Sequence, residues 1–239
     1  MHTRPQRITS TNCREYALQA PFSCVPSTLD AIEAAMSPAR LMRFGRGTTS
    51  DRHYALRLYV WNARLCEEFY LPCQIAEVTI RNAIHSTLSR RFSDMWFDNA
   101  GFMGQMVGKY ATEVVRVAKA QRALRGTAFT ADHLVAEMTF GFWVHLLTSR
   151  YEDLLWQGGV FRSFPNVPEG VTRENVYLRV NRLRNFRNKV AHHFAIFDQR
   201  PTTEYRNLIE LVEMVCGETA WMIRQLANPA RVISAKPRL

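Results

Sequence analysis

Apolar residues recur along this chain at the three- and four-residue spacing of an α-helix, and no stretch shows a convincing strand alternation. Proline, glycine and capping residues divide this pattern into segments. Helices are therefore predicted after an N-cap within 25–28, from Ser37-Pro38 to Gly45, and over 51–92 with an interruption near Pro72. Two more are predicted over about 103–124, with an end at Gly126, and from Thr130 to about 155, where the helix runs through Gly141 or bends at it. The last two are predicted after Thr172 and from about Thr203 to Asn228-Pro229. The segment 157–170 is predicted to be a loop. The pattern favours an all-α fold, with 1–24 as a loose arm and 25–239 as a single helical domain.

Composition narrows the class of protein. Hydrophobic residues fill 47% of the 239 positions, which is enough for a sizeable core. No apolar run approaches the roughly 18–20 residues of a membrane span, and the first residues lack the apolar stretch of a secretory signal. We therefore expect no membrane contact and a cytoplasmic location. The five cysteines are scattered without a CxxC pair, and the HExxH, P-loop and GxGxxG signatures are absent, so neither a metal nor another cofactor is predicted.

The charge of the chain favours a polyanionic partner. Lysine and arginine total 31 against 21 acidic residues, giving a net charge of +10 and a pI near 9.8. Arginine far outnumbers lysine, and its planar fork binds phosphate through two parallel hydrogen bonds. Nucleic acid is the commonest partner for such a surface. A merely basic surface is the alternative that charge alone leaves open.

The segment RNKVAHH, residues 187–193, concentrates proton-handling side chains on one predicted helix. Its apolar stripe is predicted to comprise Val176, Val180, Leu183, Val190 and Phe194. Arg187 lies in the middle of that stripe, where an unpaired arginine is costly. His192 stands about 140° away from Arg187 on an ideal helix. For both to act on one substrate, either the helix ends or tightens near Ala191, or a second chain supplies one of the groups.

A second constellation, EVTIRNAIH, spaces Glu77, Arg81 and His85 four residues apart. Glu77 shares its helix face with apolar residues, so it is predicted to be mostly buried and within ion-pair reach of Arg187 or Arg81. The three side chains form either a structural clasp between helices or a support for the residues of the first motif.

The chemistry available in RNKVAHH matches metal-independent RNA cleavage. Attack by a 2′-hydroxyl on the neighbouring phosphate needs a base, an acid for the leaving 5′-oxygen and a cation for the charge of the phosphorane. Histidine transfers protons near neutral pH, arginine binds the phosphorane and asparagine orients either group. Arg187, His192 and Asn188 supply these parts.

The string LRNFRNKVAHH (183–193) resembles the Abi-like (abortive infection) branch of the HEPN superfamily, whose motif is Arg-x4–6-His. The blocks EVTIRNAIHSTLSRRFSDMWF (77–97) and MTFGFWVHLL (138–147) are similar to that branch as well. The three blocks occur in the family's order and cover the chain from about 50 to 220. Arg81 and His85 are one residue too close for the same motif, which favours a supporting role for them.

The resemblance implies a HEPN-type helical bundle with extra helices, usually dimeric, and a metal-independent endoribonuclease that leaves 2′,3′-cyclic phosphate and 5′-hydroxyl ends. It implies a bacterial toxin or phage-defence effector, with RNA, a second copy and an antitoxin or other regulator as partners. Arg187 and His192 would be the catalytic pair and Asn188 the polar residue after the arginine; His193 also satisfies the spacing. The alternative is a non-catalytic RNA-binding or regulatory module in which the motif holds a dimer interface.

Overall fold

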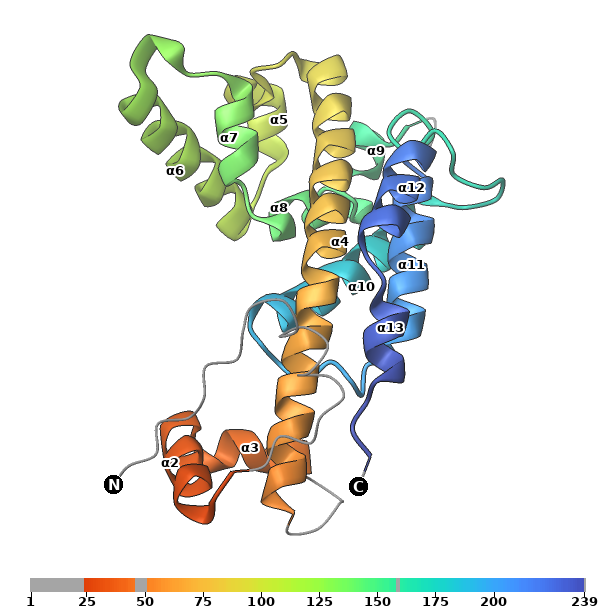
Figure 1. Cartoon of the computed structure of the whole chain (residues 1–239). Helices are drawn as coiled ribbons and strands as arrows, with labels where there is room; N and C mark the ends of the chain where they lie inside the picture. Colours follow the sequence, from red (N-terminus) through yellow and green to blue (C-terminus); the bar gives the residue numbers. More distant parts are fainter. Residues whose placement is uncertain (1–23, 46–50, 158–159, 239) are drawn as a thin grey trace. The chain divides into compact units, whose positions relative to one another are not determined.

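The computed structural model describes residues 24–45, 51–157 and 160–238, and within them it contains helices and no strand (Figure 1). The all-α prediction is confirmed. The α-helices are α2 (Pro26–Met36), α3 (Pro38–Gly45), α4 (Arg52–Phe92), α5 (Ala100–Gln105), α6 (Gly108–Arg125), α7 (Ala131–Glu137), α8 (Phe140–His145), α9 (Glu152–Leu155), α10 (Arg173–Ala191), α11 (Pro201–Glu213), α12 (Gly217–Leu226) and α13 (Pro229–Ser234). Short 3-10 helices cover Trp96–Asp98, Gly126–Ala128 and Ser149–Tyr151.

The described residues group into two compact units. Unit 1 consists of the described residues up to position 70, Lys189–Tyr205 and 227–238. Unit 2 consists of 71–188, without 158–159, and Arg206–Leu226. Helices α4, α10 and α11 each contribute to both units. The single domain expected over 25–239 stays a prediction, and the loose arm expected over 1–24 lies outside the described residues except for position 24.

Unit 1 packs the short helices α2 and α3 against the first half of α4. Leu29, Leu41 and Leu56, one from each helix, form a buried cluster. Arg52 links α4 to α2 through ion pairs to Asp30 and Glu33, both at 2.6 Å. The N-cap of α2 is Val25, whose apolar side chain makes no hydrogen bond, and Pro26 takes the first helical position. The cap expected within 25–28 therefore relies on proline geometry and not on a hydroxyl.

Unit 2 is built around an aromatic core. Trp96 is fully buried and stacks on Phe142 with ring centroids 5.8 Å apart, while Phe102 and Trp143 contact it edge-on. These rings come from α5, α8 and the 3-10 helix after α4. Offset and edge-on pairs of this kind add roughly 0.5–1.5 kcal/mol each beyond their buried area. The core therefore fixes the positions of several short helices that would be marginal alone.

Helix α4 is continuous through Pro72, so the interruption expected there is wrong. A proline inside a helix removes one backbone hydrogen bond and costs roughly 3 kcal/mol. An unbroken apolar stripe offsets that cost. The stripe residues are all at most 2% exposed: Leu65, Phe69, Cys73, Ala76, Ile80, Ile84 and Leu88. Their spacing of three or four residues runs across the proline without a change of face.

Several other boundaries differ from the sequence prediction. The helix expected from about 103 divides into α5, which Asn99 caps through the Phe102 amide at 2.9 Å, and α6, which ends before Gly126 as expected. The long helix expected from Thr130 begins there but breaks into α7, α8 and α9. The last predicted helix divides into α11 and α12, and α13 follows Asn228, which the sequence prediction took as an end signal. The described part of 157–170 contains no helix, as predicted.

Candidate functional site

The candidate site is carried by α10 and the turn that follows it. Thr172 caps α10 as predicted: its hydroxyl accepts from the Asn175 amide at 3.2 Å, and the Asn175 side chain accepts from the Thr172 amide at 3.0 Å. Val176, Val180, Leu183 and Val190 of the predicted apolar stripe are all buried, at 5% exposed or less. Asn181, which follows Val180 on this helix, keeps a buried side-chain oxygen that has no hydrogen-bond partner among the described residues.

In unit 2, Arg187 forms an ion pair with Glu77, which is one of the two pairings predicted for Glu77. Its Nε lies 2.7 Å from Oε2 of Glu77 on α4, and the Glu77 side chain is only 17% exposed. Arg187 itself keeps 37% of its side chain exposed, and its Nη1 donates to Oδ1 of Asn188 at 3.3 Å. Glu77 therefore fixes the direction of the guanidinium from one side while the other side remains accessible. Arg81, the competing partner, instead buries an Nε that has no hydrogen-bond partner within the described residues.

His85 has a structural environment in the core of unit 2. Trp96 Nε1 donates to its Nδ1 at 3.0 Å, and the rings of Trp96 and Trp143 contact the imidazole edge-on. Burial lowers the pKa of His85, and Arg81 adds to this, against the opposing charges of Asp132 and Asp94. The imidazole is therefore neutral at physiological pH. This environment suits the structural reading of the upstream constellation better than proton transfer to a substrate.

The residues of the block 138–147 also pack in the core of unit 2. The apolar residues of the block are nearly all buried, and the ring of Tyr110 packs in a tilted arrangement on His145 with centroids 4.7 Å apart. Tyr151 is in hydrogen-bond contact with His145 Nε2 at 3.2 Å. A Cβ on Gly141 would lie 2.8 Å from the Tyr110 hydroxyl, so glycine is required there for this close approach. Burial lowers the pKa of His145, helped by Arg150 and Lys109.

Helix α10 ends at Ala191 in a Schellman motif, so the helix end expected near that residue is confirmed. The His193 amide donates to the Val190 carbonyl at 3.2 Å, and the Phe194 amide donates to the Lys189 carbonyl at 2.9 Å. His193 takes the left-handed position with φ of 58°, which glycine usually fills. His193 therefore terminates the helix, whereas the neighbouring His192 is exposed without that backbone role.

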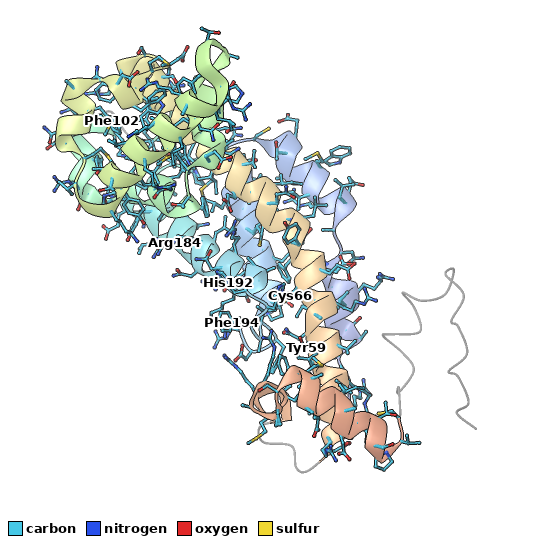
Figure 2. All side chains as sticks on the ribbon, turned by 90° about the vertical axis from the view of Figure 1, so that its left-hand side faces the viewer. Tyr59, Cys66, Phe102, Arg184, His192 and Phe194 are labelled. Atoms are coloured by element: carbon cyan, nitrogen blue, oxygen red, sulfur yellow. The ribbon has the colours of Figure 1, made fainter. Side chains whose placement is uncertain are left out.

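Phe194 corrects the sequence prediction, because it is 47% exposed and not part of the buried stripe. The stripe was extended at 100° per residue, but the chain leaves the helix before this position. Figure 2 labels His192 and Phe194 at the end of α10, with Cys66 and Tyr59 of α4 near them in unit 1. An aromatic ring that the helical pattern assigned to the core is instead available at the surface of the turn.

Asn62 of α4, which sequence reasoning missed, holds the segment after the turn. It is 3% exposed, its Nδ2 donates to the Phe194 carbonyl at 3.2 Å, and its Oδ1 accepts from the Ile196 amide at 2.9 Å. Cys66, one turn later, also contacts the Phe194 carbonyl, and burial raises the pKa of its thiol to about 11. A neutral thiol and a bifunctional amide thus anchor the backbone of the 194–196 segment. A lone asparagine in an apolar stripe was the available signal.

Comparison with known proteins gives no match: no family model, no curated protein and no solved structure matches this chain. The Abi-like resemblance consequently rests on the three sequence blocks. No helix of the described residues is both long and apolar enough to cross a membrane. The described histidine, cysteine and acidic side chains form no group suited to holding a metal ion. In unit 2 the guanidinium of Arg187 is oriented by Glu77 and lies beside the amide of Asn188, and in unit 1 the imidazole of His192 is exposed.

Proposed function

We propose that this protein is a metal-independent endoribonuclease of the Abi-like HEPN type, acting as a toxin or phage-defence effector. The observation that supports this best is the accessibility of its two reactive groups. His192 is exposed and Arg187 keeps 37% of its side chain exposed, although the apolar residues between and around them on α10 are buried. A purely structural polar pair has no need of such access.

Each group has one role in the proposed reaction. His192 takes the proton of a 2′-hydroxyl, the 2′-oxygen bonds to phosphorus and the bond from phosphorus to the 5′-oxygen breaks. A proton delivered to the 5′-oxygen completes the step, leaving a 2′,3′-cyclic phosphate and a 5′-hydroxyl. Arg187 stabilises the charge of the phosphorane. Asn188 and Glu77 position Arg187 through the contacts described above, and His193 serves the helix end.

A homodimer completes this proposal, since a second copy of the motif would supply the second proton-transfer group. In a two-fold dimer each surface patch meets its own copy, so two His192 side chains could share one RNA strand. Light scattering on the purified protein measures the oligomeric state. Co-expression of an Arg187→Ala chain with a His192→Ala chain should restore part of the activity if the site is composite. A strictly monomeric protein that still cuts RNA would refute the dimer.

A second candidate function is a non-catalytic RNA-binding or regulatory module. It is favoured by one observation: Arg187 is already engaged by Glu77 and Asn188. In this reading the same contacts stabilise the bundle or a dimer interface. The two functions differ in turnover, because the module would bind RNA and leave it intact.

The deciding experiment incubates the pure protein with total RNA in EDTA and maps the cut ends. Cutting with cyclic phosphate ends is expected, and Arg187→Ala and His192→Ala should each lower the rate by about 10²–10⁴-fold. Arg184→Ala is the matched control, because the Arg184 guanidinium donates to the side-chain oxygen of the adjacent Asn185 at 3.4 Å and not to a carboxylate. His193→Gly should keep its activity. Intact RNA, or cutting only with added divalent metal, would refute the nuclease.

A further inference from the structure

Unit 1 presents a group of cationic and aromatic side chains beside the end of α10. Arg40 and Arg43 lie on one exposed side of α3. Arg40 donates to the His193 carbonyl at 3.1 Å and lies over the Tyr59 ring at 5.8 Å, and Arg43 lies over the Phe194 ring at 5.8 Å. We call Arg40, Arg43 and Phe194 the α3 platform.

The charges of the platform are not neutralised within the described residues. The contacts of Arg40 and Arg43 are to a carbonyl oxygen and to rings, not to carboxylates. Arg52, by contrast, is held by Asp30 and Glu33 on α2. Arg43 and the N–H donors of Arg40 that do not bind the His193 carbonyl therefore remain available for phosphate oxygens.

Phe194 adds a second property that a merely basic surface lacks. The residue is 47% exposed, while its backbone is fixed by Asn62 and by the Lys189 carbonyl. An exposed aromatic ring on a fixed backbone, flanked by arginines, is the arrangement on which unpaired nucleobases stack. Within a duplex the bases are already stacked on their neighbours, so such a surface favours single strands.

The position of Phe194 relates the platform to the proposed chemistry. An extended residue spans at most about 3.5 Å, so the Cα atoms of His192 and Phe194 are at most about 7 Å apart. A base on Phe194 would therefore belong to a nucleotide next to the 2′-hydroxyl that His192 deprotonates in the proposed reaction. We infer that the α3 platform binds single-stranded RNA, with Phe194 stacking one nucleobase beside the scissile phosphate and Arg43 and Arg40 contacting the backbone. This inference rests on the proposed nuclease function for its cleavage site, but not for binding.

The test is a binding titration with a fluorescent single-stranded RNA carrying 2′-O-methyl groups, which cannot be cut because the attacking hydroxyl is absent. Phe194→Ala should weaken binding by about 5- to 150-fold, the range that one base stack supplies. Phe194→Tyr should bind like the wild type. Phe161→Ala is the matched control, because Phe161 is also exposed, at 51%, but lies in unit 2. Thermal unfolding checks that each variant keeps its fold.

The salt dependence of RNA binding distinguishes base stacking from ionic contacts to phosphate. Arg43→Gln should lower the slope of log K against log salt by about 0.7, the value for one phosphate contact on a single strand, whereas Phe194→Ala should leave the slope unchanged. Arg116→Gln on α6 in unit 2 is the control for lost charge. Equal binding by the Phe194→Ala and Phe161→Ala variants, or equally tight binding of the matching duplex, would overturn the inference. Cleavage of unmodified RNA is measured in parallel. Binding that depends on Phe194 without any cleavage would refute the nuclease function but support RNA binding by the α3 platform.

Discussion

The ion pair between Arg187 and Glu77 gives a prediction that separates a positioning role from a stabilising one. The perturbation is a double-mutant cycle with Glu77→Gln, Arg187→Gln and the double variant. Glu77→Gln removes the charge at nearly constant side-chain volume, and Arg187→Gln removes the charge while keeping a polar, though shorter, side chain. Because each single variant leaves its partner in place, the cycle isolates the energy that couples the two side chains.

The magnitude follows from the exposure of the pair. Exposed ion pairs contribute about 0.2–1 kcal/mol, and breaking a fully buried pair from one side costs about 3–5 kcal/mol. Glu77 is 17% exposed and Arg187 is 37% exposed, so solvent screens this pair substantially. We therefore expect a coupling of about 1–2 kcal/mol, below the range for a buried pair. For a chain of this size that corresponds to about 2–8 °C in Tm.

The assay is urea unfolding of the four proteins at low and high salt, with RNA cleavage as a second readout. The matched control is the cycle on Arg224 and Glu213, also in unit 2, whose side chains are 44% and 42% exposed. Its coupling should stay below about 1 kcal/mol. A coupling between Arg187 and Glu77 no larger than that of the control would refute the reasoning. Loss of cleavage in Glu77→Gln beyond its loss of stability would assign it a positioning role.

Three further predictions concern residues around the site. His193→Gly should stabilise the protein by about 1 kcal/mol in thermal unfolding, because glycine tolerates φ of 58°. His192→Gly should give no such stabilisation, and equal effects of the two substitutions would contradict the Schellman assignment. Asn62→Ala should cost about 2–3 kcal/mol in urea unfolding, because the buried Ile196 amide loses its partner and the Phe194 carbonyl keeps only the Cys66 thiol; a change below about 0.5 kcal/mol would contradict this role of Asn62. Burial lowers the pKa of His85 and His145 below the ordinary 6.5, so the unfolded chain binds more protons than the folded chain in acid. The free energy of unfolding should therefore fall as pH drops below about 6.5. His85→Gln should weaken that dependence, and a variant with an unchanged pH profile would contradict the role given to His85.

The sequence predicted what depends on local pattern. The apolar face of α10 was correct at Val176, Val180, Leu183 and Val190, since a regular helix repeats its geometry. The same rule failed at Phe194, because a histidine carries no strong signal for the left-handed residue that ends the helix. Charge on an apolar face correctly predicted the Glu77–Arg187 pair, because burying either group alone is costly.

Interactions between distant segments were beyond such reasoning. Pro72 looks like a helix breaker locally, and only the buried stripe on both sides of it explains why α4 continues. Asn62 stands out as a polar residue in an apolar stripe, but only the fold shows that its partner is the 194–196 segment. Arg40 likewise gains its meaning from a carbonyl 153 residues away in the sequence. These contacts are set by tertiary packing, which one sequence does not encode in its local periodicity.

The anchoring of the segment after α10 has an entropic consequence for whatever binds there. Holding one backbone residue in a single conformation costs roughly 1–2 kcal/mol, and in a free loop that cost falls on the ligand at the moment of binding. Here Asn62 and the helix-ending turn have already fixed the backbone on both sides of His192 during folding. An incoming strand would need to order the side chains alone. Under the proposed RNA binding, the asparagine buried on α4 would raise affinity without touching the ligand, because it removes conformations that the unbound segment would otherwise explore.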